Sequence, residues 1–191
     1  MSGWDEHLEG YRVVVQEVLE EVVLVDDEGT PIGTADKATV HTTNTPLHLA
    51  FSCHVINAEG KVLVTRRALT KATWPGVWTN AVCGHPAPGE EMVDAIIRRV
   101  RHEIGLDITD ITPVIPSFRY RAVDASGIVE HEICPVFIAH AGSDPTPRDD
   151  EVCEWKWIKP SELQSAVASA PFAFSPWLVD QLEQWPGNYL A

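Results

Sequence analysis

Residues 84–106, GHPAPGEEMVDAIIRRVRHEIGL, contain the clearest secondary-structure pattern in the chain. Apolar side chains recur there at the spacing of one helix face, at Val93, Ile96, Ile97 and Val100. Gly105 follows, and glycine is the residue that most often ends a helix in a left-handed conformation. The stretch therefore predicts an amphipathic helix over residues 90–104.

Upstream of this helix, short apolar runs separated by turn residues predict strands. These strands cover residues 21–25, 47–56 and 62–68, and the last two form a hairpin around a turn at residues 57–60. Residues 77–83 form another short apolar segment, and residues 30–45 are polar and loop-like.

Downstream, the same patterns predict strands over residues 115–122, 128–139 and 152–158, with a loop at residues 141–150. Pro160 and Pro176 each fit the first position of a helix, and the second helix runs to about residue 184. Mixed strands followed by helices favour a layered α/β (mixed α+β) fold. We expect one domain over residues 21–191, preceded by an extension at residues 1–20.

Composition limits the classes of partner. The net charge is −14, which argues against nucleic acid or an anionic membrane. Seven of the fourteen Lys and Arg residues nevertheless lie between residues 61 and 101. This cluster favours a small anionic ligand, and a solvated charged face is the alternative.

Cysteine usage and the N-terminus indicate the compartment. The four cysteines form no CxxC pair and no tight framework, so neither a zinc knuckle nor a disulfide scaffold is expected. The first fifteen residues do not resemble a signal peptide, and no stretch is long and apolar enough to span a membrane. We expect a cytoplasmic protein with Cys83 as a free thiol.

Two segments offer chemically active side chains. Residues 80–86, NAVCGHP, place the Cys83 thiol two residues from the His85 imidazole. In a strand-like run, Glu130 and Glu132 lie two apart and so point to the same face. Two buried carboxylates repel each other unless a cation or proton separates them, although an edge strand with its acidic face in water would also explain the pair.

Three histidines, His41, His48 and His85, are candidate nitrogen ligands beside these two carboxylates. Five such ligands suit an octahedral Mn²⁺, Mg²⁺ or Fe²⁺ ion, or zinc with raised coordination. The ligands come from four separate segments, so their spacing alone does not establish that they meet. The other histidines, at positions 7, 54, 102, 131 and 140, are expected to be ordinary.

Residues 37–185 closely resemble the type 1 isopentenyl-diphosphate Δ-isomerases. The resemblance is carried by sequence motifs that occur in the same order as in the family: HLAFS at 48–52, TRRA at 65–68, WPGVWTN at 74–80, VCGHP at 82–86, FRYRA at 118–122, GIVE at 127–130 and FSPW at 174–177. This family has the Nudix fold, so the resemblance implies a mixed β-sheet flanked by helices.

The Nudix pattern GX5EX7REUXEEXGU, with U an aliphatic residue, starts at Gly84 and is partly altered. Most positions fit, namely Gly84, Glu90, Arg98, Val100, Glu103, Gly105 and Leu106. Arg99 and His102 stand where the hydrolase pattern has glutamates. Those glutamates help hold the magnesium ions that activate water, so their replacement argues against a diphosphate hydrolase, the alternative function.

The resemblance implies conversion of isopentenyl diphosphate to dimethylallyl diphosphate by protonation and deprotonation. It assigns proton transfer to Cys83 and Glu132, a supporting hydrogen bond to Tyr120 and contact with a carbocation to Trp177. It also implies a set of diphosphate-binding residues: Lys37, Arg67, Lys71 and Arg99.

Two cofactors follow from the same resemblance. One divalent metal (Mn, Mg or Zn) would be held by three histidines and two glutamates, His41, His48, His85, Glu130 and Glu132. One Mg²⁺ would bind with the diphosphate through Glu103 and the Cys83 carbonyl, as oxygen ligands suit magnesium. We expect a small-molecule substrate, no nucleic-acid or membrane partner, and a monomer or homodimer. A catalytically silent metal-binding scaffold is a third reading, disfavoured because every reactive group is present.

Overall fold

The helix predicted over residues 90–104 is confirmed as α2, Met92–Ile104, in the computed structural model, which describes residues 20–187 and 189. Its Ile96 and Val100 are fully buried, whereas Val93 is exposed to solvent. Gly105 ends α2 with a left-handed φ of 62°, and its N–H donates to the carbonyl of Arg101. A glycine adopts this conformation without steric penalty.

The larger sheet has the strand order β12-β5-β4-β11-β8. The strands are β4 (Phe51–Asn57), β5 (Val62–Arg67), β8 (Ile108–Ile115), β11 (Val136–Ala141) and β12 (Val152–Ile158). Two short strands, β6 (Trp78–Thr79) and β7 (Val82–Gly84), pair with β5 and β4. β4 and β11 run parallel while the other pairs are antiparallel, so the sheet is mixed.

The smaller sheet has the order β2-β1-β3-β10-β9. Its strands are β1 (Glu21–Val25), β2 (Pro31–Asp36), β3 (His48–Leu49), β9 (Arg119–Val123) and β10 (Val129–Ile133). The short helix α1, Lys37–Val40, follows β2.

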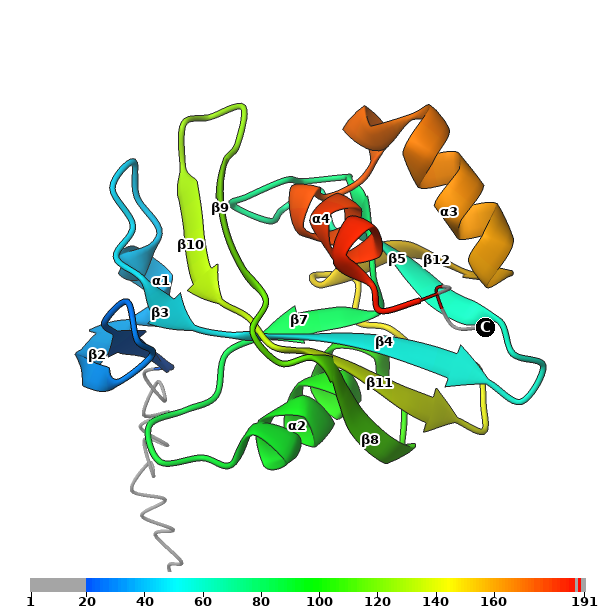
Figure 1. The fold of residues 1–191 in the computed structure, drawn as a ribbon, viewed down its shortest axis with the longest axis horizontal. Helices are drawn as coiled ribbons and strands as arrows, with labels where there is room; N and C mark the ends of the chain where they lie inside the picture. The colour runs from blue at the N-terminus through cyan, green and yellow to red at the C-terminus, as the bar shows by residue number, and fades with distance from the viewer. Residues whose placement is uncertain (1–19, 188, 190–191) are drawn as a thin grey trace, which may run out of the picture.

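Helices cover both faces of the larger sheet (Figure 1). α2 packs on one face over a core that includes Phe51, Leu63 and Ile96. On the other face lie α3 (Pro160–Ser169) and α4 (Pro176–Gln184), joined by the 3-10 turn Pro171–Ala173. Leu163 and Leu178 of these helices share a second core with Val64. The predicted layered fold with a mixed sheet between helices is confirmed.

Several sequence predictions hold at the level of elements. The strands predicted at residues 21–25, 62–68 and 152–158 are β1, β5 and β12, and both helices predicted from proline positions begin at Pro160 and Pro176. The 47–68 hairpin also forms, closed by a hydrogen bond from the Asn57 N–H to the Lys61 carbonyl.

Other predictions were wrong. Residues 30–45 are not a loop, because β2 pairs with β1 along the edge of the sheet and α1 follows it. β2 is mostly exposed, so it lacks the apolar alternation that marks a buried strand. β8 was missed for the same reason, since most of its side chains are exposed or half-buried. The strand predicted at 115–122 is β9, which begins at Arg119.

The single strand predicted at 128–139 is two strands in different sheets. β10 ends at Ile133 and β11 begins at Val136. The segment between them contains Pro135, whose nitrogen cannot donate to a ladder. The strand predicted at 47–56 is likewise divided at Ala50 into β3 and β4.

Among residues 20–187 and 189, the structure contains no helix long and apolar enough to cross a membrane. The predicted extension lies outside the described residues apart from Glu20, as does His7.

Candidate active site

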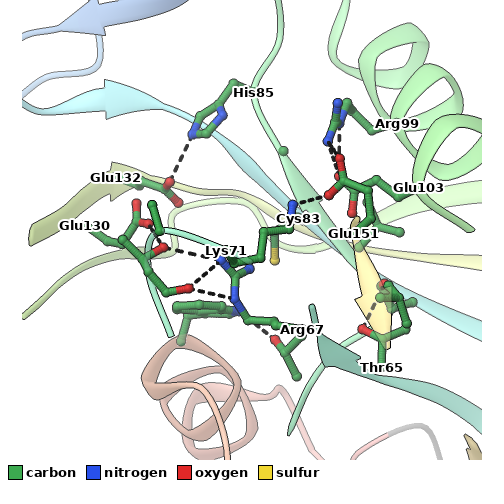
Figure 2. A pocket seen from close by; sticks show the side chains of 18 of the residues that line it. Thr65, Arg67, Lys71, Cys83, His85, Arg99, Glu103, Glu130, Glu132 and Glu151 are labelled. Carbon is green, nitrogen blue, oxygen red and sulfur yellow. Dashed lines mark hydrogen bonds and ion pairs between the residues drawn. The ribbon is translucent and has the colours of Figure 1, made fainter. Parts of the chain in front are cut away.

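A pocket of about 220 Å³ opens where the two sheets meet. Its lining includes every residue predicted to bind metal, substrate or a proton, except His48. That histidine is fully buried and contacts the lining residues His85 and Glu132. Figure 2 shows carboxylates, cations and the Cys83 thiol converging on this pocket from strands, from helix α2 and from loops.

Three histidines and one glutamate form a compact cluster on one side of the pocket. One ligand atom from each of His41, His48, His85 and Glu132 lies within 4.8 Å of all the others. His41 follows α1, His48 is on β3, His85 follows β7, and Glu132 is on β10. The parallel pairing of β3 with β10 places His48 beside Glu132.

The hydrogen bonds of His48 leave one ring nitrogen available for a cation. Its Nδ1–H donates to the Pro46 carbonyl at 2.9 Å, which leaves a lone pair on Nε2 when the ring is neutral. This Nε2 lies 3.2 Å from His85 Nε2. The nearby His41 Nε2 is buried and makes no well-aligned hydrogen bond among the described residues, although a Glu130 oxygen lies 3.0 Å away. Nitrogen atoms converging in this way, with a carboxylate beside them, fit a divalent metal ion.

Glu132 has a strongly perturbed titration. Burial acts to raise the pKa of Glu132, but hydrogen bonds with His48 and His85 outweigh burial and hold the pKa well below its usual range. Burial lowers the pKa of His85. Burial also acts to lower the pKa of His48, but the hydrogen bond to Glu132 outweighs burial and raises it. The cluster therefore holds an ionised carboxylate, the form of Glu132 that binds metal.

Glu130 lies beside this cluster and faces the pocket with Glu132. One of its oxygens lies 3.0 Å from His41 Nε2, and the other accepts a hydrogen bond from the Thr73 hydroxyl at 2.8 Å. Glu130 is not within the 4.8 Å set, so its place as a fifth ligand stays a prediction. Both carboxylates are buried, which excludes the edge strand with its acidic face in water.

The Cys83 thiol faces the pocket from β7. It lies 3.5 Å from the Ser52 hydroxyl and 3.4 Å from the Asn80 side-chain oxygen, both within hydrogen-bonding range for sulfur. Burial raises the pKa of Cys83 to about 12. The thiol is therefore protonated at neutral pH and can act as an acid.

Two aromatic residues line the pocket near these groups. Tyr120 lies opposite Glu132 in the pairing of β9 with β10, and burial raises its pKa well above the usual value. The hydrogen bond from Tyr120 to Glu132 is not present among the described residues and stays a prediction. Trp177 is 3% exposed, and its ring centroid lies 5.4 Å from the Arg67 guanidinium carbon.

Cations gather at the other end of the pocket. Lys71 pairs with Glu151, and Arg99 donates to Glu103 at 2.5 Å and to Glu151 at 3.3 Å. Burial raises the pKa of Glu103 even with Arg99 beside it. A further cation there would favour the ionised carboxylate, so Glu103 fits a magnesium ion.

The side chains of Arg66 and Arg67 diverge as expected for neighbours on a strand. Arg67 lines the pocket and binds the Thr73 carbonyl, whereas Arg66 donates to the Gly76 carbonyl outside the pocket. Lys37 reaches the pocket from α1 and pairs with Glu20.

Sequence reasoning missed several polar residues that hold the reactive groups in place. Thr73 fixes Glu130, Glu151 neutralises two of the cations, and Ser52 and Asn80 contact the thiol. Ser52 and Asn80 belong to the family motifs at residues 48–52 and 74–80, but nothing in their spacing indicated these contacts. The other histidines in the described part of the chain lie outside the metal cluster.

Known proteins with similar sequences indicate the family of this chain. The model of the NUDIX domain family matches residues 46–178. A protein of Kocuria rhizophila, named isopentenyl-diphosphate Delta-isomerase, is 59% identical over 165 residues, which cover 86% of this chain and 92% of that protein. A protein of Clavibacter sepedonicus with the same name is 61% identical over 161 residues, covering 84% and 85%.

The fold itself also has a solved counterpart. A crystal structure from Deinococcus radiodurans superposes with a TM-score of 0.68 and covers 87% of this chain and 99% of that one. At 16% identity the likeness concerns the fold alone. The match to the NUDIX model and the identity to these relatives over most of their length show that the chain belongs to the isopentenyl-diphosphate Δ-isomerase family, within the Nudix fold.

Proposed function

We propose that this protein isomerises isopentenyl diphosphate to dimethylallyl diphosphate by adding a proton at C4 and removing one from C2. The single observation that carries the proposal is the pocket itself, which holds a half-buried thiol and a buried carboxylate from different strands, with cations at one end. The charged diphosphate of the substrate matches the cationic end of the pocket, and its five-carbon tail matches the part that holds the thiol and the carboxylate.

The diphosphate is bound by positive side chains at the end of the pocket near α2. Lys37, Lys71 and Arg99 line that end, and Arg67 also lines the pocket, with its guanidinium over the Trp177 ring. The first three cations now pair with the carboxylates of Glu20, Glu103 and Glu151. When substrate enters, they bind phosphate oxygens in place of these carboxylates. Arg99 is suited to bidentate binding of phosphate.

Two groups carry the proton transfers. The protonated Cys83 thiol and the Glu132 carboxylate act at C4 and C2, so that one group donates and the other accepts. The buried site keeps water from the intermediate. Tyr120, which lies beside Glu132 in the strand pairing, supports that carboxylate.

Positive charge develops at C3 during this transfer. The indole of Trp177 lies in the pocket and presents an aromatic surface that stabilises a cation. Its N–H donates to the Thr79 hydroxyl at 2.9 Å, which fixes the orientation of the ring.

A divalent metal (Mn²⁺, Mg²⁺ or Zn²⁺) would be held by His41, His48, His85, Glu130 and Glu132. When bound, it supplies positive charge that keeps Glu132 ionised and oriented. A Mg²⁺ ion entering with the diphosphate would be held by Glu103 and the Cys83 carbonyl.

We also propose a cytoplasmic location. All four cysteines lie in the described residues and are free thiols, which fits a reducing compartment. The choice between monomer and homodimer stays a prediction, and sedimentation of the purified protein would decide it.

The proposal is tested by NMR of the purified protein with isopentenyl diphosphate and Mg²⁺ in D₂O. We expect dimethylallyl diphosphate that has gained deuterium, with the diphosphate phosphorus signals intact. Release of phosphate with the alkene unmoved would instead establish a diphosphate hydrolase. An unchanged substrate, also after addition of Mn²⁺ or Zn²⁺, would refute the proposed substrate.

A further inference from the structure

A continuous chain of buried polar side chains leads from the Cys83 thiol away from the pocket to Tyr189 near the C-terminus. The Tyr189 hydroxyl lies 2.8 Å from His54 Nδ1, and His54 Nε2 lies 2.9 Å from the Gln181 side-chain oxygen. The same Gln181 oxygen accepts a hydrogen bond from the Ser52 hydroxyl at 3.2 Å. Ser52 in turn contacts the thiol.

Every member of this chain is buried. Ser52, His54 and Gln181 have no exposed surface, and Tyr189 is 2% exposed. Apolar neighbours surround them, including Trp185, whose ring packs edge-on against both His54 and Tyr189. Burying polar groups is unfavourable unless they are hydrogen-bonded, and the Gln181 amide nitrogen is buried without a partner among residues 20–187 and 189. Packing alone would be served as well by apolar side chains at these positions.

With the Gln181 side-chain oxygen as the common acceptor of Ser52 and His54, the hydrogen bonds run in one direction. Burial lowers the pKa of His54 to about 4, so its ring is neutral and carries one hydrogen. With Nε2–H donating to Gln181, Nδ1 accepts from the Tyr189 hydroxyl. The Ser52 hydrogen is directed to Gln181, which leaves the Ser52 oxygen free to accept a hydrogen from Cys83.

Asn80 presents a second acceptor to the thiol. Its amide nitrogen donates to the Ser52 hydroxyl at 2.9 Å and to the carbonyls of Cys53 and Val82. This orientation turns the Asn80 oxygen toward Cys83 and toward the indole N–H of Trp177. The thiol and the indole are thus held by one amide.

We infer that Tyr189, His54, Gln181 and Ser52 are positioning residues, which together with Asn80 fix the direction of the Cys83 S–H bond relative to the pocket. The inference rests on the proposed function, because the direction of the S–H bond matters for the reaction only if the thiol donates its proton to the substrate. It also makes the C-terminal segment, through Tyr189, a determinant of the rate of proton transfer.

Infrared spectroscopy of the substrate-free protein tests the network directly. The S–H stretching band of Cys83 is assigned by its loss in Cys83→Ala, and its frequency falls when the thiol donates a hydrogen bond. We expect Gln181→Leu to shift or broaden this band, because Ser52 loses its acceptor and reorients. Gln184→Leu is the matched control, since Gln184 lies exposed on the same helix and its loss leaves the band in place.

Turnover provides the second measurement. Gln181→Leu and Tyr189→Phe are expected to lower kcat with little change in KM, by about tenfold or more for Gln181, because small displacements of a reacting group reduce rate strongly. Tyr189→Phe removes a single oxygen and so preserves the packing with Trp185. It therefore reports on the hydrogen bond even where Gln181→Leu lowers stability.

The inference is overturned if both variants keep the wild-type S–H band and kcat while only the melting temperature falls, since the chain would then serve stability alone. A wild-type protein that does not isomerise the substrate would refute the proposed function. Even then the S–H band, recorded without substrate, would report whether the network orders the thiol.

Discussion

At the scale of single residues, the surroundings of Cys83 select its protonated form. Burial raises its pKa to about 12, and its two polar neighbours can accept its hydrogen. Cys83→Ala removes the acid without a large change in volume, and we expect kcat to fall by at least about 100-fold. Measured kinetics should show this loss with unchanged metal content, while Cys153→Ala, at an exposed thiol, retains full rate. Turnover retained in Cys83→Ala would remove the thiol from the mechanism.

Arg99 is expected to act in substrate binding. It is buried on α2, lines the pocket and replaces a glutamate of the hydrolase pattern. Arg99→Gln should raise KM for isopentenyl diphosphate by about tenfold or more, as expected for a lost charge-assisted contact. Arg101→Gln is the control, because Arg101 lies on the same helix but its side chain is exposed beside Asp107. An equal KM in the two variants would contradict the assignment.

His54 makes stability depend on pH. Its pKa is lowered to about 4 by burial, while the unfolded chain has an ordinary value near 6.5. Between these pH values the unfolded state binds the proton more strongly than the folded state. The contribution of His54 to the free energy of unfolding is therefore complete above pH 6.5 and is lost as the pH falls toward 4. His54 should contribute a loss of about 2 kcal/mol between pH 7 and 5.

Urea unfolding at both pH values measures this effect. The loss on acidification should be smaller in His54→Phe than in the wild type. His140→Phe provides the control, because His140 is exposed on the neighbouring strand β11. Identical pH dependence in the wild type and His54→Phe would show that His54 does not contribute.

At the scale of elements, the end of α2 depends on one glycine. A Cβ atom at Gly105 would lie 2.3 Å from Thr146 Oγ1 and 2.8 Å from the Thr146 carbonyl, in addition to the left-handed φ of 62°. Gly89 has a similar φ of 77° but no atom within 4 Å of such a Cβ. Gly89→Ala should therefore lower the free energy of unfolding by the cost of the left-handed conformation alone, about 1–2 kcal/mol. Gly105→Ala should lower it clearly more, because the contact with Thr146 adds to that cost. Equal losses would show that the Thr146 contact relaxes freely.

The elements that the sequence predicted well are those with a one-sided apolar pattern or a defined end. α2 has both, and α3 and α4 begin at prolines. β2 and β8 have mainly exposed or half-buried side chains, so hydrogen bonding to neighbouring strands defines them rather than apolar spacing. The division of 128–139 into β10 and β11 depends on which sheet each half joins, and this is a property of the tertiary fold.

At the scale of the whole molecule, the candidate site could be identified from residue types and family resemblance but not from spacing. His41, His48, His85 and Glu132 come from four segments, and the arrangement of both sheets brings them together. Residues that merely support these groups carry no separate signal in the sequence. Ser52 and Gln181, for instance, lie 129 positions apart and meet because α4 packs on the larger sheet.

This convergence predicts that metal stabilises the whole fold. His48 and Glu132 belong to the smaller sheet, whereas His85 follows β7 of the larger one. An ion bound by all of them links the two sheets in the folded state alone, and at 100 times its dissociation constant it adds about 2.7 kcal/mol. For a chain of this size the melting temperature should rise by about 5–10 °C.

Thermal unfolding of chelator-treated protein, with and without added Mn²⁺ or Zn²⁺, measures this rise. His85→Gln should abolish most of it, because His85 lies 3.1 Å from Glu132 and 3.2 Å from His48 at the centre of the cluster. His131→Gln should retain it, since His131 lies between the two glutamates on β10 but outside the cluster. If His85→Gln gained as much stability from the metal as His131→Gln, the ion would bind elsewhere, and the histidine cluster would be an ordinary hydrogen-bonded group between the sheets.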